Sequence, residues 1–439
     1  MQLKKALLGV SALLSAAIWA PQAQAIPAFA RQVGMPCSAC HYQHFPTLNS
    51  FGRAFKEGGF TMMGTEPTIE GDGLSIPATL NLAFITNLAY QKNNGPAATS
   101  ATTKTTNDGQ FQMTQYSLFM GGRVGKNIGF EGEVGLSGGA ALASVKIPFA
   151  QDWGSFKTLE VPFTTDGLGA QQGFELLSTG ASPVHLFNQQ DLTAISASEY
   201  LGTDTPANGL ALVAANDYGF INFTKWQIDS MNGNNAQGPG GNGGGSPTSS
   251  YLRAAWLGNI GDFDAGAGFQ VWSGQSTASA GGAYDPLGNG LGGTYTTKAH
   301  AIDGQLMGDV GSMPLTLIAS YAVAPTVSGT DPVNAFNIGG TDDKKSFNIA
   351  AELGVLPKTT VQLGFRNAKS GQYVPGTTSG NASDNAVMIG ATYEVALNAR
   401  FELTYSKYSG DLYNSFSMAN GGPNGTGDNM TVANLWIDY

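Results

Sequence analysis

Polar and apolar residues alternate one for one along much of the chain, from about residue 76 to the C-terminus. A period of two is the pattern of a β-strand whose two faces meet different surroundings. The clearest example is a pair of runs with apolar residues on one face and polar residues on the other. The apolar face holds Val387, Ile389, Ala391, Tyr393, Val395, Phe401, Leu403 and Tyr405, and the polar face holds Glu402, Thr404 and Ser406. The pattern predicts a mainly β fold.

The connections between these runs alternate between short turns and long loops rich in Gly, Asn, Ser and Thr. Short turns lie near residues 125–127, 216–217, 259–261, 309–313, 356–358 and 396–398, and long loops near 92–109, 231–250, 274–295, 325–344, 370–385 and 410–429. Short turns at one end and long loops at the other are typical of antiparallel barrels of the bacterial outer membrane. We therefore expect a transmembrane β-barrel over residues 76–439.

Strand number and orientation follow from the same pattern. About fourteen strands can be counted, and the unclear stretch 146–208 has room for two more, so we expect about sixteen strands, with fourteen as the alternative. An even number places both barrel termini on one side, which in this class is the periplasmic side. A secreted β-sandwich or β-helix would also alternate, but its outer face would be charged, whereas here the outward positions are apolar or aromatic in strand after strand.

The N-terminal residues have the features of a secretory signal. Lys4 and Lys5 precede the apolar run Ala6–Trp19, and Ala23-Gln24-Ala25 fits a small-x-small cleavage site, so we assign residues 1–25 to a signal peptide. No later stretch has the ~18 apolar residues of a membrane-spanning helix. Basic residues number 21 against 31 acidic ones, a net charge of −10, which argues against nucleic acid or anionic lipid as partner and favours the approach of cations.

The two cysteines of the chain lie together in Cys37-Ser38-Ala39-Cys40-His41, which matches the C-x-x-C-H signature of c-type haem attachment. Two thiols three positions apart can bond to the two vinyl groups of one haem, and the next imidazole can then ligate the iron. A redox dithiol would need a βαβ pattern, which is absent. A zinc site would need four ligands, and only His44 is near. We expect one covalently attached haem c, with His41 as proximal iron ligand.

The second axial ligand is less clear from the sequence. Candidates are methionine or histidine side chains: Met35, His44, Met62 and Met63 in the same segment, and the distant His185 and His300. We favour Met62 or Met63, although both would also serve as packing against a porphyrin. Thr47–Gly59 predicts a short helix with Leu48, Phe51 and Phe55 on one face. Residues 26–75 therefore read as a small helical cytochrome segment and linker, which would act as a basic plug inside an acidic barrel.

At this point the sequence resembles a known family, the fused outer-membrane cytochrome-porins of iron-oxidising bacteria. The similarity is concentrated in the segment 26–60: Pro27-Ala28-Phe29-Ala30-Arg31-Gln32, the haem motif, and Phe45-Pro46-x-Leu48-Asn49-x-Phe51-Gly52-Arg53-x-Phe55-Lys56. The resemblance implies oxidation of extracellular Fe(II), with the electron passing to a periplasmic carrier such as a soluble cytochrome. It also implies Cys37 and Cys40 as attachment residues and His41 as proximal ligand.

Two other functions fit the same pieces, namely a passive porin whose plug carries a haem, and outward electron transfer to extracellular oxidants. If the chain is an iron oxidase, Glu131, Glu133, Asp262 and Asp264 are candidate iron-contacting carboxylates inside the barrel. Simple polarity of the lumen is the better explanation of these four residues, because outer-sphere oxidation needs no dedicated metal site.

Overall fold

The computed structural model describes residues 28–64, 66–72, 74–95, 109–136, 141–178, 195–228, 248–278, 293–327, 332–374, 380–396, 398–419 and 427–438. The signal peptide predicted at residues 1–25 lies outside this part of the chain. None of the helices in the described part is long and apolar enough to cross a membrane.

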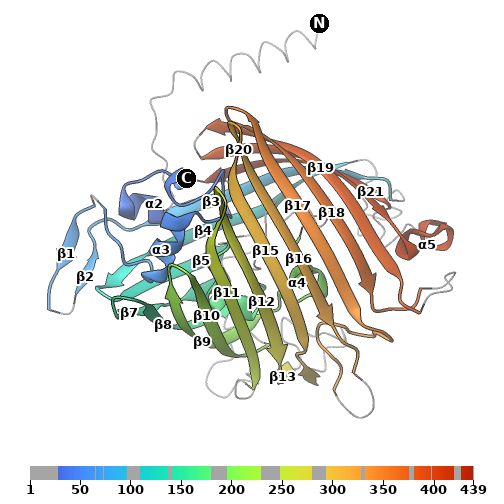
Figure 1. The fold of residues 1–439 in the computed structure, drawn as a ribbon, viewed down its shortest axis with the longest axis horizontal. Helices are drawn as coiled ribbons and strands as arrows, with labels where there is room; N and C mark the ends of the chain where they lie inside the picture. The colour runs from blue at the N-terminus through green and yellow to red at the C-terminus, as the bar shows by residue number, and fades with distance from the viewer. Residues whose placement is uncertain are drawn as a thin grey trace, which may run out of the picture.

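Most of the described chain forms one closed antiparallel β-barrel (Figure 1). Its strands are β3 (Leu82–Asn93), β4 (Gln110–Gly125), β5 (Ile128–Gly135), β6 (Ala141–Lys146), β7 (Phe149–Asp152), β8 (Lys157–Thr165), β9 (Ala207–Asn216), β10 (Gly219–Gln227), β11 (Ser249–Ile260), β12 (Phe263–Ser273), β15 (Ala299–Val310), β16 (Met313–Ala324), β17 (Lys344–Leu356), β18 (Thr359–Ser370), β19 (Ser383–Ala396), β20 (Ala399–Ser409) and β21 (Asn429–Asp438). The last strand, β21, pairs with the first, β3, and closes the barrel.

The barrel has sixteen strands when β6 and β7 are counted as one interrupted strand. Both halves pair with β5 on one side and with β8 on the other. The break falls at Ile147 and Pro148, where proline has no N–H to donate to a neighbouring strand. This strand and β8 occupy the stretch that the sequence left unclear, and the expected number of sixteen is confirmed.

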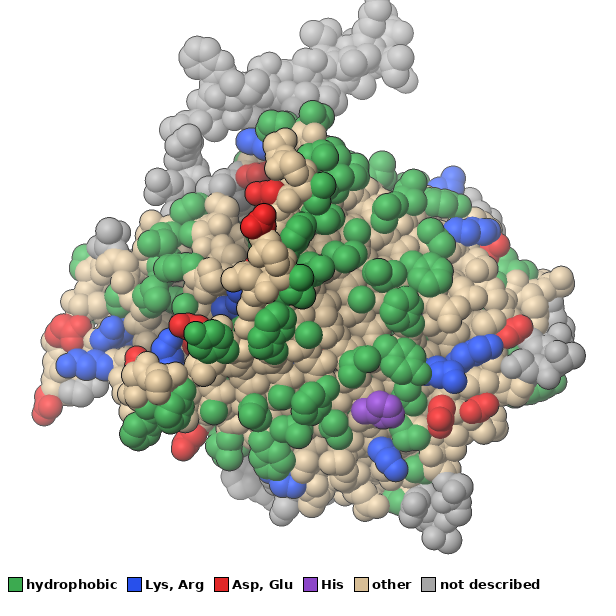
Figure 2. Space-filling model, viewed as in Figure 1, with side chains coloured by type: hydrophobic (Ala, Val, Ile, Leu, Met, Phe, Trp, Pro, Cys, Tyr) green, Lys and Arg blue, Asp and Glu red, His purple; other side chains and the backbone are tan. Residues whose placement is uncertain are grey.

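The two faces of the wall differ as the alternation predicted. On β18 the outward side chains Val361, Leu363 and Phe365 are exposed, whereas the inward Gln362 and Arg366 are buried. Figure 2 shows hydrophobic side chains spread over the outer face of the barrel, with few charges among them. A closed barrel with such an outer face is suited to standing in lipid, because its polar backbone groups are paired between strands.

One loop folds into the lumen instead of remaining outside, and we call residues 166–206, described over 166–178 and 195–206, the inner loop. It contains η2 (Ala170–Gly173) and α4 (Ala197–Leu201), and α4 packs against β15, β16 and β17. Arg253 of β11 anchors it, since its Nε donates to Glu175 at 3.0 Å while Nη1 and Nη2 each donate to Asp303 of β15 at 2.8 Å.

The inner loop also explains why the expected polar inner face fails on β8 and β9 and in part on β10. Phe174, Leu176 and Leu177 of the loop pack with inward side chains of these strands, among them Leu159, Val161, Val213 and Phe220. The inward faces of β8 and β9 are therefore apolar where they meet the loop, whereas β10 keeps the buried polar Asn222 and Thr224 beside Phe220. Strand β8 lies in the stretch 146–208, where the sequence showed no clear alternation.

The N-terminal segment lies at the short-turn end of the barrel, beside the C-terminus (Figure 1). It comprises α2 (Ala28–Val33), η1 (Cys37–Ala39) and α3 (Ser50–Glu57), and we call residues 28–64 the plug. The predicted helix Thr47–Gly59 is shorter than expected, because Asn49 caps α3 by accepting a hydrogen bond from the Gly52 N–H at 3.0 Å.

Smaller elements lie in the linker and in the long loops. The linker contains a two-stranded hairpin, β1 (Thr68–Glu70) and β2 (Ser75–Pro77). The loop expected at 274–295 contains a second small sheet, β13 (Gln275–Ala278) with β14 (Gly293–Thr296). The last long loop contains η3 (Asp411–Tyr413) and α5 (Ser415–Ala419).

Candidate haem site in the plug

The two cysteines and the histidine of the C-x-x-C-H motif share one tight turn. The N–H groups of Cys40 and His41 both donate to the Cys37 carbonyl, at 3.1 and 2.9 Å. Both thiols are free and partly exposed, so no disulfide joins them. Burial raises the pKa of the Cys37 thiol to about 11, with the carboxylates of Asp438 and Glu394 adding to the effect. The motif therefore lies near the ends of β19 and β21.

The imidazole of His41 is held in one orientation by a backbone carbonyl. Its Nδ1 lies 3.2 Å from the Thr47 oxygen, and because a carbonyl can only accept, Nδ1 carries the proton. That leaves the lone pair of Nε2 free to ligate a metal, which is the usual arrangement of a metal-bound histidine. Burial lowers the pKa of His41 to about 4, so the ring is neutral at pH 7. These features fit a proximal haem ligand.

Helix α3 is fastened directly to the motif by Asn49 and Gly52. The Asn49 side chain donates to the Ala39 carbonyl at 3.0 Å, and its N–H donates to the Cys40 carbonyl at 3.0 Å. A Cβ at position 52 would overlap the Cys40 carbonyl oxygen and lie 2.9 Å from Cδ2 of Leu48. Only glycine lets the helix approach the turn this closely. Both residues lie in the segment that resembles the cytochrome-porins, but the sequence pattern gave no sign of these contacts.

The plug is bound to strands on several sides of the barrel. Tyr42 donates to the Gly308 carbonyl of β15 at 2.8 Å, and the Arg53 guanidinium pairs with Asp264 of β12. His44 pairs with Glu352 of β17 at 2.5 Å. These contacts match the expectation of a basic segment held by acidic wall residues.

Further plug contacts reach the remaining strands at this end. The ring of Phe45 stacks on Trp436 of β21, with centroids 5.8 Å apart. Two strands further along the wall, Phe29 packs edge-to-face on Phe119 of β4, and the Gln32 side chain accepts from the Arg123 N–H at 2.9 Å. The plug thus spans the short-turn mouth of the barrel and places the motif inside it.

The candidate distal ligands are placed unequally. Met62 is 38% exposed and Met63 is half-buried, and the Gln32 side chain holds this stretch beside α2 by donating to the Met62 carbonyl at 2.7 Å. The choice between Met62 and Met63 stays a prediction. Met35, which follows α2, is 39% exposed.

The histidine candidates are disfavoured on geometric grounds. Both ring nitrogens of His44 are engaged, one with Glu352 and the other with the Phe45 carbonyl. His300 projects outward from β15, away from the lumen. His185 lies outside the described residues. Within the described part of the chain, no cluster of three or more His, Cys, Asp or Glu residues could hold a metal ion.

Three of the four proposed iron-contacting carboxylates have structural partners. Glu131 pairs with Lys146 at 2.8 Å, and Asp264 pairs with Arg53. Glu133 accepts hydrogen bonds from Ser117 and Gln115, at 2.7 and 3.0 Å. Asp262 is exposed in the turn before β12. These contacts favour the simpler interpretation of the four residues as polarity of the lumen.

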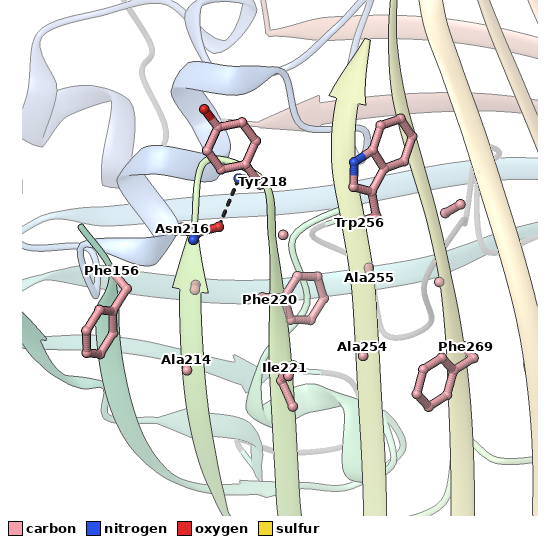
Figure 3. A pocket seen from close by; sticks show the side chains of 14 residues that line it. Phe156, Ala214, Asn216, Tyr218, Phe220, Ile221, Ala254, Ala255, Trp256 and Phe269 are labelled. Carbon is pink, nitrogen blue, oxygen red and sulfur yellow. Dashed lines mark hydrogen bonds between the residues drawn. The ribbon is translucent and has the colours of Figure 1, made fainter. Parts of the chain in front are cut away.

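A hollow of about 590 Å³ elsewhere on the barrel is remote from this chemistry. It is a shallow apolar depression on the outer wall of β9 to β12, where the small Ala214 and Ala254 lie between Ile221, Trp256 and Phe269 (Figure 3). Because it opens on the face that meets lipid, we do not assign it a functional ligand.

No family model and no curated protein matches the sequence. Among solved structures, the chain is similar to a loop-deletion variant of OmpT, an outer membrane protein of Vibrio cholerae, at 11% identity and a TM-score of 0.46, over 82% of this chain and 99% of that one. It is similar to an anion-selective porin from Comamonas acidovorans at 13% identity and a TM-score of 0.44, over 82% of this chain and 99% of that one. It is also similar to Salmonella typhi OmpF at 13% identity and a TM-score of 0.48, over 85% of this chain and 100% of that one. Similarity of this degree says nothing about what this barrel does.

Proposed function

We propose that this chain is an outer-membrane iron oxidase, a protein that takes one electron from extracellular Fe(II) and delivers it to a periplasmic carrier such as a soluble cytochrome. Its redox centre is one haem c, attached through Cys37 and Cys40 and ligated by His41, which supplies one-electron chemistry when bound. The observation that carries the proposal is the position of the C-x-x-C-H turn within the mouth of a barrel with a lipid-facing exterior.

The residues of the chain each have a definable part in this function. The Thr47 carbonyl orients the His41 ring, and burial keeps that ring neutral and able to ligate. Asn49 and Gly52 fix the turn on α3, while Arg53 and His44 hold the plug between β12 and β17. Fe(II) is the substrate, and the net charge of −10 favours its approach. We place both barrel termini on the periplasmic side.

The alternatives predict different measurements. A passive porin with a haem-bearing plug would conduct ions and would not accept electrons from Fe(II). Outward electron transfer uses the same residues, but requires a haem potential well below that of the Fe(III)/Fe(II) couple under growth conditions.

The test mixes purified, oxidised protein with Fe(II) in the absence of oxygen and follows the haem absorption. We expect reduction of the haem by Fe(II) and loss of this reaction in His41→Ala. The control is Tyr393→Ala, which removes an outward-facing ring on β19 and leaves the plug contacts intact. Failure of wild-type protein to be reduced would sink the iron-oxidase assignment, and reduction of His41→Ala at the normal rate would remove the role of His41.

A further inference from the structure

A row of basic side chains crosses the outer face of the barrel near its long-loop end. In the strand register His300 of β15 lies opposite Val323, Val323 opposite Lys345, Lys345 opposite Lys369, and Lys369 opposite Ser383. Register partners on antiparallel strands share one face of the sheet. The row therefore runs over five neighbouring strands, β15 to β19, with three basic residues on the side that meets lipid.

Within this row, the two lysines Lys345 and Lys369 lie directly opposite each other on β17 and β18. The Cβ atoms of such a pair lie roughly 4.5–5.5 Å apart, and like charges at that spacing destabilise a sheet. Lys345 is exposed, and the described residues give it no ion pair. Lys369 donates to the Asn381 carbonyl at 3.2 Å and is 4.0 Å from Asp411, whose carboxylate already accepts two hydrogen bonds from Ser383, at 2.9 and 2.8 Å. Within the described residues, Lys345 thus has no counter-ion, and Lys369 has only the shared carboxylate of Asp411.

The next row toward the middle of the barrel is apolar on β15, β16 and β17, and continues with the hydrogen-bonded Asn367 and Asn385 on β18 and β19. Ile302, Tyr321 and Phe347 are register partners on β15, β16 and β17, and they are 60%, 38% and 39% exposed. Two residues along a strand separate this row from the basic one by about 6.6 Å. In Figure 2, basic side chains lie toward one edge of the barrel with acidic side chains beside them, beyond the region where hydrophobic side chains dominate.

We propose that the outer face of β15 to β19 binds a phosphate-bearing lipid of the leaflet next to the long loops. Lys345 and Lys369 would contact the phosphate, His300 would flank it, and Tyr321 and Phe347 would lie along the acyl chains. The net charge of the chain argues against anionic lipid, but a local row of cations next to an apolar belt is the arrangement that recruits an anionic headgroup. A soluble protein partner fits poorly because the row continues into the lipid-facing belt.

The test uses the full-length haem-loaded protein in detergent micelles and counts bound lipids by native mass spectrometry. The probes are phosphatidic acid and diacylglycerol with the same acyl chains, and inorganic phosphate as competitor. We expect phosphatidic acid to bind and diacylglycerol to bind far more weakly. Lys345→Gln combined with Lys369→Gln should weaken phosphatidic acid binding about tenfold to thirtyfold, since each cation near an anionic lipid contributes roughly a factor of five.

The matched control is Lys92→Gln combined with Lys225→Gln, which removes two outward lysines from β3 and β10 and should leave the affinity unchanged. A second readout is thermal unfolding, in which phosphatidic acid should raise the Tm of wild type and of the control pair, but not of the double variant. Equal binding of both lipids, equal affinity of the two double variants, or displacement of the lipid by millimolar inorganic phosphate would each overturn the proposal. If the double variant does not fold, Lys345→Gln alone must show the weakened binding.

Discussion

One very close backbone approach in the plug occurs where a helix glycine meets the backbone of the C-x-x-C-H motif. At Gly52, any side chain would press on the Cys40 carbonyl, which accepts the Asn49 N–H, and on the Leu48 side chain. A carbonyl inside a hydrogen-bonded turn cannot move aside as the end of a flexible side chain can. The geometry of the cysteine pair therefore depends on the absence of one methyl group in the neighbouring helix.

We predict that Gly52→Ala lowers the stability of the plug by about 1–3 kcal/mol, the usual range for overpacking, and reduces the haem bound per protein. The control is Gly58→Ala at the end of the same helix, where φ is −75° and the nearest atom to an added Cβ is the Phe55 carbonyl oxygen at 3.4 Å. That change should be neutral or slightly stabilising. Haem content and chemical unfolding measure both effects. Equal behaviour of the two variants would show that the close approach at Gly52 is unimportant.

Individual residues of the site could be predicted only where covalent chemistry fixes their spacing. Cys37, Cys40 and His41 are adjacent in sequence, so their motif is visible without a fold. Thr47 acts through its backbone carbonyl, which every residue type has, so its role cannot be predicted from the sequence. Trp436 packs on the plug but lies close to the C-terminus, far from it in sequence. The distal ligand is open for a similar reason, because several methionines satisfy the same spacing.

Helix α3 carries a lysine into the interior, between the motif and the inner loop. The ammonium of Lys56 donates to the Ser178 carbonyl at 3.2 Å. Burial, helped by the charge of Lys146, lowers the pKa of Lys56 to about 7 from an ordinary 10.5. Between these two values the unfolded chain holds a proton that the folded chain lacks. Stability should therefore rise as pH increases from 7 toward 10.5, and this contribution is lost as pH falls to 7.

We predict that Lys56→Met flattens this pH dependence and stabilises the protein at neutral pH. One pKa unit corresponds to about 1.4 kcal/mol, so the effect should reach a few kcal/mol at most. The measurement is chemical unfolding between pH 7 and pH 10. Lys126→Met, at an exposed turn lysine, is the control and should follow wild type. Parallel profiles for wild type and Lys56→Met would contradict the buried, uncharged state of this lysine.

At the level of elements, the sequence predicted strands well where one face meets lipid and the other meets polar lumen. It was weakest over 146–208, because the inward faces of β8 and β9 pack apolar side chains against the inner loop and because Pro148 divides a strand in two. The inner loop was not foreseen, because its residues resemble those of any other long loop. Its anchor, Arg253 with Glu175 and Asp303, joins three segments that only the closed barrel brings together.

On the scale of the whole molecule, the lumen is crossed twice. The plug spans the short-turn mouth and is tied to the wall by Arg53 and His44, while the inner loop crosses deeper and is tied by Arg253. Because the plug and the inner loop obstruct the same lumen in series, releasing one of them leaves the ionic current limited by the other. The ionic current through the barrel therefore tests the passive-porin alternative without reference to the haem.

We predict that wild-type protein in planar lipid bilayers passes little ionic current. Arg53→Met combined with His44→Gln frees the plug, and Arg253→Met leaves Glu175 and Asp303 to repel each other and frees the inner loop. Either change alone should leave the current low, whereas the triple variant should raise it severalfold. Lys126→Gln combined with Lys358→Gln removes charges from turns at the same mouth and is the matched control.

An open channel in wild type would favour the passive porin. A channel opened by the plug variant alone would mean that the inner loop leaves a continuous path, and the barrier to ions would then lie in the plug.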